Sequence, residues 1–114
     1  MQKWYILPMA WRVEVLDEAK AALTAMPVDI RASFARIAHL IEEHGLERVR
    51  EPYVRHLEGR LWEMRMKGKD GIARAVYVSA TGRRVVVVHV FVKKTEKTPR
   101  REMEGAKRRA RDIR

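Results

Sequence analysis

Charged and apolar side chains alternate along residues 61–67, which read Leu-Trp-Glu-Met-Arg-Met-Lys. Successive side chains of a strand point to opposite faces, so the pattern predicts a strand with Glu63, Arg65 and Lys67 on one face. The Gly-Lys-Asp-Gly turn at 68–71 pairs this strand with the next one, which carries Arg74. A basic face on a rigid sheet suits a phosphodiester, either to bind it or to cut it.

Cleavage of RNA by side chains alone requires a base for the 2′-hydroxyl, a positive group for the charged phosphorane and an acid for the leaving oxygen. A guanidinium stays charged and matches phosphate oxygens, so Arg65 and Arg74 are the candidates for the second task. A solvated, charged sheet face is the alternative for both arginines. Glu63 is the best carboxylate candidate for the base, and an ordinary cross-strand ion pair is its alternative.

A lysine-rich segment follows the last predicted strand. Lys93, Lys94 and Lys97 leave that strand towards the same site, and we expect at least one of them to contact phosphate. A lysine becomes a base only where neighbouring positive charge lowers its pKa, and Lys94 is the candidate for a catalytic role. Lys93 and Lys97, with Lys67, are candidates for substrate binding. Phe91 could stack on a base, with a place in the core as the equal alternative.

The sequence holds no group of residues with metal-ligand spacing. It has no cysteine, and His39, His44 and His56 are scattered. His89 lies inside a valine-rich run and is interpreted as a structural imidazole. We therefore expect neither a metal nor a cofactor.

The chain is strongly basic, with 25 Lys/Arg against 15 Asp/Glu and a formal net charge of +10. The excess is large at the end, where residues 93–114 hold ten Lys/Arg and four Asp/Glu. This balance predicts attraction to a polyanion such as nucleic acid or the ribosome. An acidic protein partner and a merely soluble basic surface are the alternatives.

The length of 114 residues suits one domain with a modest core, and we expect a single domain over 1–114 with residues 1–10 as an N-terminal extension. The apolar stretch at the start is short and interrupted by Pro8, unlike a signal peptide, and Met9 is a second candidate start. The longest apolar run, Val85–Val88, is far shorter than a membrane span. These features predict no membrane contact and a cytoplasmic location.

Two helices are predicted to follow the first strand. Trp11–Leu16 alternates as a strand, Asp17 is placed to cap a helix that runs to about Met26, and Pro27 ends this helix. Gly45 is a good stop for the second helix. That helix has one apolar stripe at helical spacing, which comprises Ile30, Phe34, Ile37, Ala38 and Ile41.

Two further strands and a helix complete the predicted chain. Ile72–Ser79 and Val85–Val92 are strands, and the β-branched composition of the second predicts a central strand. Tyr53–Leu57 is a weaker candidate for a short strand. Thr98 and Pro99 are placed as the N-cap and first residue of a basic C-terminal helix. The order β-α-α-β-β-β-α predicts an α+β fold, in which an antiparallel sheet carries the N-terminal helix hairpin on one face.

Three segments together resemble the RelE/ParE toxin superfamily, and within it the HigB-like, phage-derived branch. They are LWEMR at 61–65, IARAVY at 72–77 and FVKKTEKTP at 91–99, and the likeness extends over residues 11–114. The resemblance implies a RelE-like fold and the toxin of a type II toxin–antitoxin pair. RelE-like and HigB-like members cut messenger RNA in the ribosomal decoding site, whereas ParE-like members poison DNA gyrase.

The resemblance also assigns roles to residues. It places Arg74 where RelE-like toxins have a phosphate-binding arginine, and Arg65 where they have another basic residue. No His-Tyr pair follows Pro99, so the general acid that some relatives use is missing. The implied activity is that of a ribosome-dependent endoribonuclease, or mRNA interferase, which inhibits translation. Its implied partners are the ribosome, mRNA and a cognate helix-turn-helix antitoxin. A gyrase poison and a non-catalytic RNA- or ribosome-binding module are the alternatives.

Overall fold

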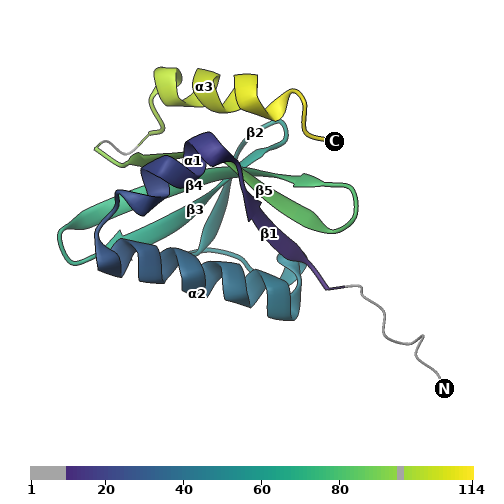
Figure 1. The fold of residues 1–114 in the computed structure, drawn as a ribbon, viewed down its shortest axis with the longest axis horizontal. Coiled ribbons are helices and arrows are strands. Elements are labelled where there is room, and N and C mark those ends of the chain that lie inside the picture. The colour runs from purple at the N-terminus through teal and green to yellow at the C-terminus, as the bar shows by residue number, and fades with distance from the viewer. Residues whose placement is uncertain (1–9, 95–96) are drawn as a thin grey trace.

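Five strands form one sheet in the order β1-β5-β4-β3-β2, with helices on both faces (Figure 1). The computed structural model describes residues 10–94 and 97–114. The elements are β1 (Arg12–Val15), α1 (Asp17–Thr24), α2 (Val28–His44), the 3-10 turn η2 (Leu46–Arg48), β2 (Val54–Glu58), β3 (Leu61–Gly68), β4 (Gly71–Ala80), β5 (Arg84–Val92) and α3 (Arg100–Ala110). This architecture confirms the predicted α+β class.

Tight turns place β3, β4 and β5 side by side as an antiparallel meander. Gly68 pairs with Gly71 across the first turn, so the turn predicted at 68–71 is present and only two residues connect the strands. The register that follows puts Arg65 opposite Arg74, and Arg74 opposite Phe91. Because residues directly opposite each other share a sheet face, these three side chains form one row.

The first strand departs from the predicted antiparallel arrangement, because β1 joins β5 in parallel, with Val13 opposite Val85. Residues 16–83 separate these two strands in the sequence, so no hairpin fixes their relative direction. β5 lies between β1 and β4, which confirms its predicted central position. The weak strand candidate before residue 58 is a strand, β2, at the far edge of the sheet. The described residues thus form one strand more than the predicted order contains.

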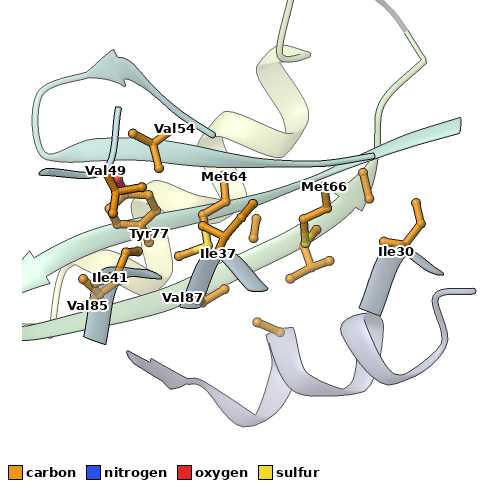
Figure 2. Close-up of a cluster of buried hydrophobic side chains, with 14 residues drawn as sticks. Ile30, Ile37, Ile41, Val49, Val54, Met64, Met66, Tyr77, Val85 and Val87 are labelled. Atoms are coloured by element: carbon orange, nitrogen blue, oxygen red, sulfur yellow. The ribbon is translucent and has the colours of Figure 1, made fainter. Parts of the chain in front are cut away.

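Two hydrophobic clusters attach the helices to the sheet. On one face, Ile37 and Ile41 of α2 pack near Met64 of β3, and α1 contributes Ala19 to the same cluster (Figure 2). The predicted helix pair therefore covers one face. On the opposite face, α3 packs with Ala106 and Ala110 onto strand residues Leu61, Val76, Val78, Val86, Val88 and Phe91. Met103 and Ile113 also pack there, so the apolar stripe of the basic helix is its buried side.

Two helix starts differ from the predicted caps. Asp17 is the first residue of α1, and Leu16 holds the N-cap position without a side-chain hydrogen bond. Pro99, not Thr98, holds the N-cap position of α3. α1 thus starts one residue earlier than predicted, and α3 starts one residue later. The later start of α3 leaves the side chain of Thr98 available for a tertiary contact. Gly45 ends α2 as predicted, with a φ of 93° that favours glycine.

Candidate active site

The sheet face beneath α3 carries the predicted site residues. Arg65, Arg74 and Phe91 lie in one row across β3, β4 and β5. Glu63 and Lys67 are two residues away from Arg65 along β3, in opposite directions, so they share its face. The pairing predicted from the turn is thus present, and it gathers four charged residues at the end of the β3–β4 hairpin.

A buried hydrogen-bonded network lies at the centre of this face. Arg74 Nη1 donates to Glu63 Oε2 at 2.6 Å and to Thr98 Oγ1 at 3.3 Å, and Thr98 Oγ1 donates to Glu63 Oε1 at 3.2 Å. The side chains of Arg74 and Glu63 are only 2% and 0% exposed. The solvated sheet face, which was the alternative for Arg74, is therefore not the environment of this arginine. The cross-strand ion pair, the alternative reading of Glu63, is present.

The segment from Lys93 to Pro99, here called the connector, joins β5 to α3, and its residues 93–94 and 97–99 are described. The backbone N–H of Lys93 donates to the carbonyl oxygen of Ile72 at 2.8 Å, which attaches the start of the connector to β4. Thr98 attaches its other end to Glu63 and Arg74. The side chains of Lys94 and Lys97 are exposed, and Lys93 is half-buried.

Arg65 is the more exposed of the two arginines that lie opposite each other on β3 and β4. It is half-buried, whereas Arg74 is buried. The Nε atom of Arg65 is enclosed and has no hydrogen-bond partner within the described part of the chain. Lys67 on the same face is exposed. These two cations, rather than Arg74, are the sheet residues that a phosphate can reach in this conformation.

Phe91 lies in the hydrophobic cluster beneath α3 and is 8% exposed. Its ring is tilted against the ring of His89, with 5.7 Å between their centroids. The core position, one of the two interpretations of this residue, is therefore what the structure contains. Stacking of Phe91 on a base would require the side chains that cover its ring to move.

His89 links β5 to α3. A β-bulge leaves Val88 without a partner in β4, because Val76 pairs with His89 and Tyr77 with Val87. Arg109 Nη1 of α3 donates to the Val88 carbonyl oxygen at 2.9 Å and lies 3.1 Å from His89 Nδ1.

Arginine offers only donors, so the contact with Nδ1 requires the His89 tautomer that carries its proton on Nε2. That N–H donates to Glu102 Oε1 at 2.6 Å. His89 is thus a structural histidine, in agreement with the interpretation of its place in the sequence.

Sequence reasoning missed the residues that hold the site together. Thr98 was assigned to a helix cap, and no contact with His89 was foreseen for Glu102 or Arg109. Thr98 is 35 residues from Glu63 in sequence, so no local pattern could join them. Glu102 and Arg109 are seven residues apart, so a helix places them on one face. This spacing was the signal in the sequence that could have linked both residues to His89.

A second ion pair attaches α3 to the edge strand. Lys107 of α3 pairs with Glu58 of β2. The hydrogen bond from Lys107 lowers the pKa of the Glu58 carboxyl, and the same bond raises the pKa of the Lys107 ammonium. Both side chains are well exposed, so this pair adds little to stability.

A cavity of about 690 Å³ lies apart from these residues. Its lining includes Trp11, Val49, Val54, Trp62 and Tyr77, and three of these belong to the cluster beneath α2. Burial raises the pKa of the Tyr77 phenol. None of the predicted site residues lines this cavity.

Within residues 10–94 and 97–114, no group of three His, Cys, Asp or Glu side chains could hold a metal ion. None of the described helices has the length and apolar character to cross a membrane.

A comparison with protein-family models assigns this chain to a known family. The model of the family described as "Phage derived protein Gp49-like (DUF891)" matches residues 21–111. The chain belongs to this Gp49-like family. The matched range includes every residue of the candidate site, from Glu63 to Thr98. A search of curated proteins finds no match.

Solved structures of other proteins have folds similar to the fold of this Gp49-like protein. The crystal structure of the archaeal RelE–RelB complex from Pyrococcus horikoshii OT3 contains a chain with a TM-score of 0.58 and 19% identity, over 73% of this chain and 94% of that one. A double arginine-to-alanine mutant of the E. coli toxin RelE in the free state has a TM-score of 0.63 and 16% identity, over 88% and 97%. The predicted RelE-like fold is confirmed.

Proposed function

We propose that this protein is the toxin of a type II toxin–antitoxin pair and acts as a ribosome-dependent mRNA endoribonuclease of the HigB-like kind. The observation that carries the proposal is the cluster of cations on one sheet face of a RelE-like fold. Half-buried Arg65 and exposed Lys67 lie on β3, and the connector is bonded to the same part of the sheet at Ile72 and Glu63. Lys94 and Lys97 of the connector are exposed as well. Such a surface attracts the RNA backbone, and its rigid sheet can hold a phosphate in one geometry.

In the proposed reaction Arg65 and Lys94 stabilise the charge that develops on the phosphorane, because both can approach a phosphate from solvent. Lys67, Lys93 and Lys97 bind the neighbouring phosphates. Lys94 is also the proposed base: it takes the proton of the 2′-hydroxyl, and the ammonium that forms then faces the phosphorane. No metal or cofactor takes part in this scheme.

The buried pair has a different proposed task. Arg74 and Glu63 neutralise each other at 2.6 Å, and both are enclosed. We therefore propose that Glu63 positions the cations around it instead of acting as a free base. Arg74 would touch a phosphate only after the connector moves, and Phe91 would touch a base only after its cover moves.

We propose ribosome dependence because the described residues of this site lack a strong general acid and a strong general base. Orientation of the 2′-hydroxyl by the ribosome would replace part of what a strong general acid and base supply, and orientation can lower a barrier by about 7–11 kcal/mol. Purified protein should cut mRNA in programmed ribosomes and leave the same naked RNA nearly intact. Equal cleavage of both substrates would contradict the proposal.

The gyrase alternative makes a different prediction in cells. Pulse labelling after induction should show protein synthesis falling first if mRNA is cut. DNA synthesis would fall first if the protein poisoned gyrase. A protein that binds ribosomes without cutting mRNA would be the non-catalytic module.

The proposed partner is a small helix-turn-helix antitoxin, in addition to the ribosome and mRNA in the cytoplasm. One of the structural neighbours was crystallised as a RelE–RelB complex. A short helix-turn-helix gene beside the gene for this chain would support the pairing.

A further inference from the structure

We infer that Thr98 is a positioning residue, whose hydroxyl tethers the connector to the buried Glu63 carboxylate and so fixes the lysines of the connector over the sheet. The tether is a feature of the fold and does not depend on the proposed function. Its effect on catalysis rests on the proposed endoribonuclease function.

The hydroxyl of Thr98 is used in both directions. It donates to Glu63 Oε1 at 3.2 Å and accepts from Arg74 Nη1 at 3.3 Å. A hydroxyl has one donor and two acceptor positions, so both bonds can form together. Glu63 then has one oxygen bonded to Thr98 and the other to Arg74. Because the Glu63 side chain is 0% exposed, water cannot replace a lost partner without a change of structure.

The position of Thr98 in the chain turns this contact into a tether. Lys94 and Lys97 lie between two attachment points of the connector, the Lys93–Ile72 backbone bond and Thr98. Thr98 also directly precedes Pro99, the N-cap of α3. Loss of the hydroxyl contact would therefore remove one attachment from the end of the connector that carries Lys97 and leads into the helix.

Charge explains why such a tether is needed. The lysine-rich connector is bonded, through Lys93 and Thr98, to a part of the sheet that already carries Arg65 and Lys67. Like charges repel, so the lysines need to be held there. A neutral hydroxyl bonded to a buried carboxylate holds the segment in place without adding a further charge. The carboxylate at the centre of the cluster thus serves as the anchor of the connector.

The test compares Thr98→Val with the parent in single-turnover cleavage on programmed ribosomes. Valine keeps the shape and removes the hydroxyl. We expect the rate constant to fall about 10–100-fold, because Lys94, the connector lysine that faces the phosphorane, then keeps only the attachment at Lys93. The affinity for ribosomes should change less than about two-fold, since no charge is lost. Thr98→Ser keeps the hydroxyl and should restore the rate.

Thr81→Val is the matched control, because the Thr81 hydroxyl also makes a tertiary bond, to the carbonyl oxygen of Arg114 at 2.7 Å, in the turn between β4 and β5. It should cleave like the parent. A Thr98→Val rate constant within two-fold of the parent overturns the inference. So does a loss confined to the amplitude, because that reports a fraction of unfolded protein.

Trypsin cleavage measures the tether without any activity. Cutting after Lys94 and Lys97 should be several-fold faster in Thr98→Val than in the parent, Thr98→Ser or Thr81→Val. Equal cutting rates overturn the tether. If the parent does not cleave RNA on ribosomes, the proposed function fails and the trypsin comparison alone decides whether the tether exists.

Discussion

Arg74 and Glu63 bond at 2.6 Å in a place from which solvent is almost excluded, so each depends on the other. Arg74→Ala would leave a buried carboxylate without its counter-charge. We expect a loss of about 3–5 kcal/mol in the free energy of unfolding, measured by urea denaturation. Lys67→Ala is the control, because Lys67 is exposed on the same face and its loss should cost less than about 0.5 kcal/mol. Equal unfolding midpoints for the two variants would show that the pair does not support the fold.

Arg65 should behave in the opposite way. It is half-buried and opposite Arg74, and we propose that it faces the phosphorane. Arg65→Ala should therefore reduce the single-turnover rate on programmed ribosomes by about 10²–10³-fold with little change in stability. Arg65→Lys keeps the charge, loses the planar fork and should recover only part of the rate. A variant that cleaves within a few-fold of the parent would remove Arg65 from the proposed mechanism.

Strand alternation and one turn were enough to predict which charged residues share a face. Glu63 and Arg65 are two positions apart, and the glycine turn sets Arg65 opposite Arg74. Burial could not be predicted in the same way. It depends on α3 and the connector, which reach the strand face from distant parts of the chain. The role of Thr98 was hidden for this reason.

At the scale of elements, the turn between β3 and β4 is fitted closely against the start of α2. A Cβ on Gly68 would lie 2.8 Å from Ile30 Cγ1 and 2.9 Å from the Asp29 carboxylate. The same carboxylate accepts a hydrogen bond from the Lys69 N–H at 2.7 Å. Because backbone or side chains would have to shift, Gly68→Ala should destabilise the protein by about 1–3 kcal/mol.

Gly71 provides the matched control for this prediction, because it lies across the same turn and a Cβ there meets nothing within 4 Å. Thermal melts of Gly68→Ala and Gly71→Ala should therefore separate, with only the first well below the parent. If both variants melt together, the close approach of α2 does not explain the glycine at 68.

Helices and hairpin strands were predictable because their signals are local. The apolar stripe of α2, Gly45 and the turn glycines act within a few residues of the element they define. The parallel direction of β1 and the bulge at Val88 were not predictable, since both depend on contacts between segments far apart in sequence. The same holds for the one-residue shifts at the starts of α1 and α3, where packing decides the first helical residue.

At the scale of the whole molecule, charge is divided between two regions. Exposed Arg100, Arg101, Arg108 and Arg111 lie on or next to α3. Residues 39–60, which include the end of α2 and all of β2, hold four arginines and five glutamates. A polyanion is therefore attracted to the α3 side, where the candidate site lies, and not to the molecule as a whole.

This division makes a prediction about growth and about the antitoxin. If the α3 side binds mRNA on the ribosome, expression of this chain alone should arrest growth. An antitoxin that neutralises it by covering the same side should present acidic side chains there, because opposite charges speed association and select the partner. Co-expression of the product of the adjacent gene should then restore growth, and raised salt should weaken the purified complex.

Arg65→Ala separates toxicity from the burden of expressing a basic protein. The variant removes one proposed catalytic charge of the parent's +10, so it should be soluble, bind the antitoxin and leave growth unimpaired. Growth arrest by this variant would point to an effect of basic charge rather than of RNA cleavage. Normal growth with the parent chain, at verified soluble expression, would contradict the toxin function itself, whatever the partner.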